Sequence, residues 1–134
     1  MQNPNSVLKK WFYTTLSGMG FEVYDGMAPE SAGNEYIVMD ARTSNQEQGK
    51  SGYTNTCSVD IDIVTKNANF GYKRAETISD LVLTAINSQT TITLSNGFYA
   101  SSVYVASVRN LDGLNPLDNV FRTLITYNII ITQN

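Results

Sequence analysis

The sequence predicts an α+β fold, with a mainly antiparallel β-sheet and two α-helices packed on one of its faces. Strand-like segments outnumber helical ones, and most are joined by connections that are compatible with hairpins. The clearest strand is TCSVDIDIVTK at residues 56–66, in which apolar side chains occupy every second position. Two other segments, 4–18 and 73–87, carry apolar residues at helical spacing and predict the helices.

Length and composition predict one domain over residues 1–134. A chain of 134 residues buries about two-thirds of the surface that its unfolded form exposes, which is enough for one sizeable core. The sequence contains no internal repeat and no inter-domain linker. Charged residues make up 16% of the chain, which is low for a freely soluble monomer, so we expect partners to cover part of the surface.

Charge and hydropathy argue against two classes of partner. The net charge is −3, and the nine Lys and Arg residues are scattered along the chain. They do not form the basic stripe that would indicate nucleic-acid binding. No apolar run approaches the roughly 18 residues that span a bilayer, and the first residues lack a basic region followed by an apolar core. We expect neither direct nucleic-acid recognition nor a membrane segment.

The first helix is predicted to begin at Asn3 and Pro4, because Asn accepts hydrogen bonds from first-turn amides and Pro fits the first helical position. Gly18 and Gly20 end it. Its buried stripe is expected to comprise Leu8, Trp11, Phe12, Thr15 and Leu16. A short strand at 21–24 follows and closes with the turn signal Asp25-Gly26.

The second strand, YIVMDA at residues 36–41, is nearly continuous in apolar residues and is predicted to be buried on both faces. The next segment, 43–55, is rich in Ser, Thr, Asn, Gln and Gly and buries too little apolar area to offset its ordering entropy. We predict a mobile loop or a hairpin tip there, which forms a polar arm before the strand at 56–66.

The second half of the chain predicts one helix and three strands. The helix over 73–87 presents an apolar face formed by Ala75, Ile78, Val82, Ala85 and Ile86. Asn96-Gly97 predicts a two-residue hairpin turn between a strand near residues 92–94 and one at 98–108. The last strand is predicted to run for about 12 residues, with apolar side chains alternating from Phe121 to Ile131.

No catalytic, cofactor or metal site is predicted. Asp60 and Asp62 share one strand face about 7 Å apart, which would suit a divalent ion or acid–base chemistry. The chain has no His, however, and no further acidic cluster completes a ligand set, so we interpret this face as solvated or as making intersubunit salt bridges. The lone Cys57 is predicted to be a small buried hydrophobe.

The polar arm has two open interpretations, a binding element or a disordered surface loop. The first is open because long polar loops inside compact domains are often functional. Its amide and aromatic side chains can bond or pack against a partner, but their spacing does not require one. The residues predicted to contact a partner or another subunit are Arg42, Asn45, Gln46, Gln48, Lys50, Tyr53, Asp60 and Asp62.

The order of these elements resembles the tail-completion or tail-terminator proteins of long-tailed bacteriophages. In that family a short Tyr-Asp turn and a following Pro precede a strand that starts Pro-Tyr-hydrophobic. Here Tyr24-Asp25 and Pro29 occupy the first places, and Glu35-Tyr36-Ile37-Val38 occupies the strand with Glu in place of Pro. The resemblance covers residues 5–132 and includes the strand CSVDIDIVTK and the helix KRAETISDLVLTAI.

The resemblance implies a non-enzymatic structural virion protein, assembled in the host cytoplasm and located in the tail or neck. Its partners would be further copies of itself in a homohexameric ring, the tail tube protein that the ring caps, and the head-tail connector proteins. A neighbouring neck protein, such as a head-closure or adaptor subunit, has the same sequence features and stays an alternative. A small-ligand-binding α+β domain is a second alternative, which would need a concave pocket with convergent polar groups.

Overall fold

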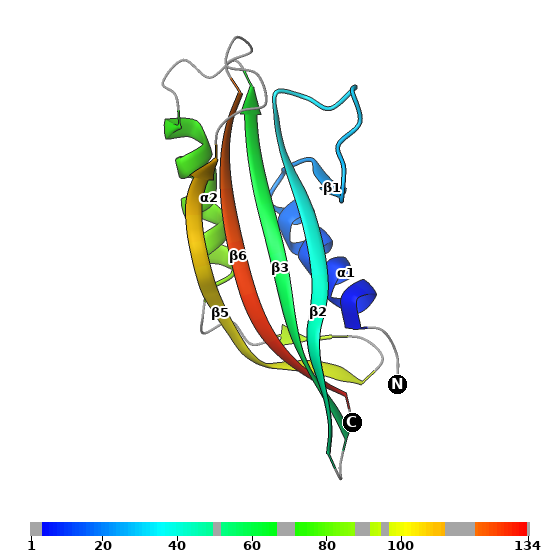
Figure 1. Ribbon diagram of the computed structural model, residues 1–134. Helices are drawn as coiled ribbons and strands as arrows, with labels where there is room; N and C mark the ends of the chain where they lie inside the picture. The colour runs from blue at the N-terminus through cyan, green and yellow to red at the C-terminus, as the bar shows by residue number, and fades with distance from the viewer. Residues whose placement is uncertain are drawn as a thin grey trace.

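A computed structural model describes residues 4–49, 52–66, 72–87, 92–94, 97–111 and 120–133, with side chains left out for 43–49, 52, 53 and 133. Two helices and six strands follow one another along the chain (Figure 1). Their bounds are α1 Pro4–Gly18, β1 Val23–Asp25, β2 Glu35–Gly49, β3 Gly52–Lys66, α2 Lys73–Ala85, β4 Ile92–Thr93, β5 Phe98–Leu111 and β6 Val120–Gln133. The structure confirms the predicted α+β class.

The strands form one six-stranded sheet in the order β1-β2-β3-β6-β5-β4. The β1 and β2 strands are parallel and every other neighbouring pair is antiparallel. The β6 strand lies between β3 and β5, and it pairs with β3 from Tyr53↔Gln133 to Lys66↔Val120. Figure 1 shows a strongly curled sheet with both helices behind it, so the two faces of the sheet have different surroundings.

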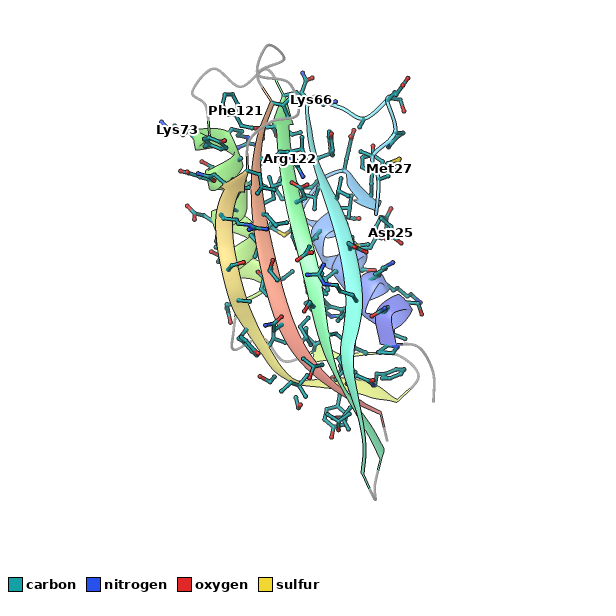
Figure 2. All side chains as sticks on the ribbon, in the orientation of Figure 1. Asp25, Met27, Lys66, Lys73, Phe121 and Arg122 are labelled. Carbon is teal, nitrogen blue, oxygen red and sulfur yellow. The ribbon has the colours of Figure 1, made fainter. Side chains whose placement is uncertain are left out.

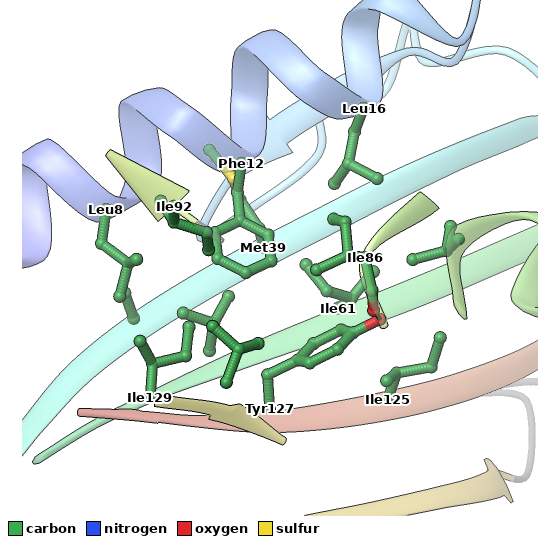
Figure 3. Close-up of a cluster of buried hydrophobic side chains, with 14 of the residues drawn as sticks. Leu8, Phe12, Leu16, Met39, Ile61, Ile86, Ile92, Ile125, Tyr127 and Ile129 are labelled. Carbon is green, nitrogen blue, oxygen red and sulfur yellow. Dashed lines mark hydrogen bonds between the residues drawn. The ribbon is translucent and has the colours of Figure 1, made fainter. Parts of the chain in front are cut away.

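The core lies between the helices and the inner face of the sheet, which we define as the face that the helices cover. Alternate residues of β3 and β6 point into it, and Cys57 is fully buried there as predicted. The Phe12 and Tyr127 rings meet at 5.8 Å between centroids (Figure 3). The Tyr127 hydroxyl donates a 2.6 Å hydrogen bond to the carbonyl oxygen of Ile86, just beyond α2, and burial raises the pKa of Tyr127. This bond ties the end of α2 to the middle of the sheet.

The start of α2 is held to both halves of the sheet. Arg74 donates two hydrogen bonds to the Glu35 carboxylate, at 2.6 and 3.0 Å, and these bonds lower the pKa of Glu35. Tyr72 packs edge-on against Phe121, and its hydroxyl donates a 2.9 Å hydrogen bond to the Leu111 carbonyl. The helix is thus anchored to β2, β5 and β6.

The β2 strand is buried on one face only, so the prediction of two buried faces is wrong. Ile37, Met39 and Ala41 are buried, while Tyr36 and Val38 are half-buried on the opposite face. The reason is that both helices lie on the same side of the sheet, so neither helix covers the outer face (Figure 1). Apolar residues at these outer positions obscured the alternation in the sequence.

The polar arm continues the strands beyond the core. Of the two predicted alternatives, a loop or a hairpin tip, the hairpin is observed: β2 and β3 pair as far as Gly49↔Gly52. A bulge between Thr43 and Asn45 marks the point where the arm begins. Backbone hydrogen bonds to a neighbouring strand order such a segment without much apolar burial. Residues 50 and 51 lie outside the described part of the chain.

Two boundaries differ from the sequence prediction. The first strand is shorter and begins later, at Val23, and it ends at Asp25, just before the positive-φ residue Gly26. In the hairpin between β4 and β5, residues 94–97 connect the strands, which is more than the predicted two-residue turn. The Leu94 N–H donates a hydrogen bond to the Phe98 carbonyl oxygen, and Gly97 has a φ of 79°. Residues 95 and 96 are outside the described residues. Within the described chain, neither helix is long and apolar enough to cross a membrane.

The alternation along β6 gives a matched test of the two faces, because Ile129 is fully buried and the next residue, Ile130, is half-buried on the outer face. We expect Ile129→Ala to lower the free energy of unfolding by about 2–5 kcal/mol through a core cavity, and Ile130→Ala by about 1 kcal/mol. Urea denaturation of both variants checks this. Equal losses would contradict the assigned faces.

Candidate assembly surface

The outer face of the sheet, which the helices do not cover, is lined by polar and half-exposed side chains of β2, β3, β6 and β5. Strand register places these side chains in rows that cross all four strands. One row runs Asp40, Asp60, Thr126 and Ser107, and the next runs Val38, Asp62, Leu124 and Arg109. Figure 2 looks onto this face. It holds three of the residues predicted from sequence to contact a partner, Arg42, Asp60 and Asp62.

Cross-strand ion pairs connect the acidic residues of β3 to both neighbouring strands. Arg42 on β2 lies 2.7 Å from Asp60, which also accepts a 2.9 Å hydrogen bond from Thr126 on β6. The Arg122 guanidinium on β6 contacts Asp62 through two nitrogens, with Nε 3.2 Å from both carboxylate oxygens. The hydrogen bonds that Arg122 donates to the Asp62 carboxylate raise the pKa of Arg122. Each carboxylate of the Asp60–Asp62 pair is therefore neutralised within the subunit.

This arrangement leaves little room for metal or acid–base chemistry. The two carboxylates that share the face each bind an arginine, and a divalent ion would have to displace it. Within the described residues, no group of three or more potential metal-ligating side chains occurs. The ladder of charges instead cross-links three strands and holds the sheet in one register.

A hollow of about 510 Å³ lies at one end of the outer face, beside the loop that follows β1. Its floor is apolar and includes Tyr36, Val38 and Val64, and its rim carries Lys66 and the Asp62–Arg122 ion pair. The Lys66 ammonium lies 5.3 Å from the Tyr36 ring centre. Met27 stands at the mouth with 82% of its surface exposed (Figure 2). An apolar floor with a charged rim is typical of surfaces that receive a side chain from another protein.

Among the residues that the structure describes, two long stretches of the sheet's edges have no strand beside them. The β1 strand pairs only with residues 37–39 of β2, so within the described chain β2 from Asp40 to Gly49 pairs with β3 alone. On the opposite edge, β4 pairs only with Tyr99 and Ala100, which leaves 102–111 of β5 paired with β6 alone. Open edges of this length present a template for a strand from another chain.

Exposed apolar side chains accompany the β5 edge. Tyr104 is 44% exposed on the outer face. Val108 belongs to the inner face, opposite Ile125, and yet it is 46% exposed. Bulges between Ala100 and Ser102 and between Val105 and Ser107 bend the strand. The edge therefore combines free backbone groups with apolar surface.

The structure brings together some of the predicted contact residues and leaves others undescribed. Arg42, Asp60 and Asp62 lie on the outer face. Arg42 pairs with Asp60, and Asp62 pairs with Arg122, so all three form ion pairs within the subunit. The backbones of Asn45, Gln46, Gln48 and Tyr53 lie in the β2–β3 hairpin, but their side chains, and all of Lys50, fall outside the described part. Whether these residues contact a partner stays a prediction.

Sequence reasoning missed Arg122, Thr126 and Arg109. A signal for the first two was present, because they occupy the positions of β6 that alternate with its apolar residues and so belong to the same face as Asp60 and Asp62. Pairing them required knowing that β6 lies beside β3. Arg109 was hidden because the strand containing it was predicted to end at Val108, three residues before its end in the structure.

Comparison with known proteins shows that this chain resembles others in fold only. No protein-family model and no curated protein matches the sequence. Among solved structures, the chain is similar to a chain from the virion of a native gene transfer agent (GTA) particle, with a TM-score of 0.69 and 16% identity, over 88% of this chain and 84% of that one. A second solved structure, whose name states no function, matches with a TM-score of 0.58 and 12% identity over 92% and 94%.

The ion pairs on the two faces differ in exposure, which predicts a difference in strength. The side chains of Arg122 and Asp62 are 24% and 17% exposed, while those of Arg74 and Glu35 are 47% and 38% exposed. Double-mutant cycles built on urea denaturation should give a coupling of about 1–2 kcal/mol for the first pair, as Asp62→Asn with Arg122→Met. The Glu35→Gln, Arg74→Met cycle should give less than about 1 kcal/mol, and the reverse order would contradict the assignment.

Proposed function

We propose that this protein is a structural component of a phage-like virion, and specifically a tail-terminator subunit that forms a ring on the end of the tail tube. The observation that carries the class is the fold likeness to the virion chain of a gene transfer agent particle, which extends over 88% of this chain. The narrower role rests on the sequence resemblance to tail terminators, in which Tyr24-Asp25, Pro29 and Glu35-Tyr36-Ile37-Val38 take part.

The two open edges of the sheet support assembly into a ring. They lie on opposite sides of the same sheet, so a contact between β5 of one copy and β2 of the next is heterologous and leaves another pair of edges free. Repetition of such a contact closes into a ring when the rotation per subunit divides a full turn. The resemblance to terminators implies six subunits.

The chemistry of the outer face supports a structural role over an enzymatic one. Its carboxylates are held in ion pairs, and its side chains cross-link strands without converging on a reacting position. The hollow beside Met27 is suited to a protein side chain. Such a surface can serve contacts with the tail tube, with a connector protein, or between subunits.

The position of the protein in a purified particle tests the proposed function. Particles from producing cells, imaged by electron cryo-microscopy with a tagged copy of this chain, should show one ring of six subunits between tail tube and head connector. A head-closure or adaptor subunit would lie on the head side of that ring. Absence of the chain from particles, or its presence in any non-ring position, would refute the proposal.

The β2–β3 hairpin offers a second test of this role. Glu47 and Thr54 are directly opposite, so an Asn-Gly turn can replace Gln48–Tyr53 and close a shorter hairpin with correct geometry. Few apolar contacts are lost, so we expect the free energy of unfolding to change by less than about 1 kcal/mol. Tail capping should fail, because the hairpin supplies contacts to the neighbouring subunit or the tube.

Thermal denaturation and a particle-yield assay measure the two effects of this hairpin replacement separately. The matched control replaces the same six residues with six Gly and Ser residues, which keeps the length of the hairpin and removes its side chains. Wild-type particle yield with the shortened hairpin would show that the hairpin is a surface feature without an assembly role.

A further inference from the structure

We propose that Arg109 on the open edge of β5 forms an ion pair with Asp40 on the open edge of β2 in a second copy of this chain, and that this pair sets the register between subunits. The inference rests on the proposed ring and names the contact that holds it together. It assigns an intersubunit role to two side chains at opposite edges of one sheet.

Both charges lack a partner among the residues that the structure describes. Arg109 is exposed on the outer face opposite Leu124, and Asp40 is exposed opposite Asp60. Like charges directly opposite each other on neighbouring strands destabilise a sheet. Asp60 is already compensated by Arg42 and Thr126, so Asp40 is the carboxylate that still needs a cation.

The strand directions allow the two edges to pair. Because β2, β3, β6 and β5 are successively antiparallel, β5 runs opposite to β2 within the sheet. When a second copy continues the sheet with the same orientation, its β2 is therefore antiparallel to β5 of the first. Placing Arg109 opposite Asp40 puts both side chains on the outer face, with Cβ atoms about 5 Å apart.

The ends of neighbouring elements favour this register. The β1 strand covers β2 as far as Met39, so a new strand can begin to pair at Asp40. On β5, the Leu111 carbonyl already accepts a hydrogen bond from Tyr72. A strand from a second copy can therefore pair with β5 only from Asn110 or Arg109 toward the start of the strand. Arg109 and Asp40 are therefore the first outer-face residues available on their edges. From there β5 pairs toward Ser102 while β2 of the second copy pairs toward Gly49.

The same register covers apolar surface on the inner face. Val108, which is 46% exposed in the single chain, comes to lie opposite Ala41 of the second copy. Two residues before Ala41 on the same face, Met39 lines a hollow of about 460 Å³ together with Asp25 and residues of α1, among them the half-exposed Tyr13. The valine side chain thus gains an apolar neighbour in Ala41 of the second copy.

The register also introduces a stagger that a closed sheet needs. Within one subunit the row that contains Asp40 ends at Ser107, and Arg109 lies in the adjacent row, two residues further along β5. Pairing Arg109 with Asp40 therefore shifts the register by two residues at each interface. Strands in closed sheets must be staggered in this way for the barrel to close.

Charge reversal tests the inference directly. Asp40→Arg and Arg109→Asp each place like charges at every interface, so each variant should need at least about tenfold more protein to form rings, as measured by native mass spectrometry and sedimentation. The Asp40→Arg, Arg109→Asp double variant restores opposite charges and should assemble like wild type. Far-ultraviolet circular dichroism checks that each variant folds, which is expected because both sites are exposed.

Mixing the two single variants distinguishes a head-to-tail contact from other modes. An equimolar mixture can alternate around a ring so that every interface joins opposite charges, and it should form rings with equal numbers of both variants. Asp80→Arg, an exposed reversal on α2 and so on neither edge strand, is the matched control and should assemble like wild type. The same four variants and the mixture are also expressed in particle-producing cells, where particle yield should follow the same order.

The outcomes separate this contact from the proposed function. If the double variant and the mixture assemble no better than the single variants, both in solution and in particles, the Arg109–Asp40 contact is wrong, even where the ring is found on the tail. If the double variant and the mixture assemble like wild type while the ring is found elsewhere in the particle, the Arg109–Asp40 contact is supported and the terminator role is refuted. A wild-type chain that is monomeric in solution and in particles overturns both.

Discussion

The pairing of β3 with β6 is the interaction on which the rest of the structure depends. It joins fourteen residue pairs, from Tyr53↔Gln133 to Lys66↔Val120. The first part of the chain forms β1, β2 and β3, the later part forms β4 and β5, and β6 is the only strand that contacts both groups in the described sheet. Without it, β4 and β5 would form an isolated two-stranded hairpin, which is marginal in water, and β3 would lose the neighbour that continues its apolar face.

This pairing also produces the chemical difference between the two faces. The inner positions of β3 and β6 are apolar and place Ile61, Tyr127 and Ile129 against the helices, where each is fully buried. The outer positions place Asp60 and Asp62 beside Thr126 and Arg122. One register therefore fixes both the core and the charged ladder. A slip of one residue would exchange the two sets, which makes the register strongly determined.

Local pattern was enough to predict the elements and their faces. The alternation in TCSVDIDIVTK and the helical spacing around Phe12 each depend on near neighbours in sequence, and the structure confirms the strand and the helix. Of the predicted helix stripe, Leu8, Phe12 and Leu16 are buried, while Trp11 and Thr15 are only half-buried. The position of β6 between β3 and β5 depends on contacts between residues about 60 apart, which local pattern does not encode. The Arg122–Asp62 pair and the open edges follow from that position, so local sequence patterns could not predict them.

The central location of β6 has a consequence for the order in which the molecule is made. Residues 120–133 leave the ribosome after every other strand of the sheet, so β3 and β5 are synthesised without the neighbour that separates them. Until then the nascent chain has additional open strand edges besides those on β2 and β5. A nascent chain therefore cannot present the geometry of a finished subunit, and synthesis of the last strand acts as a checkpoint between folding and assembly.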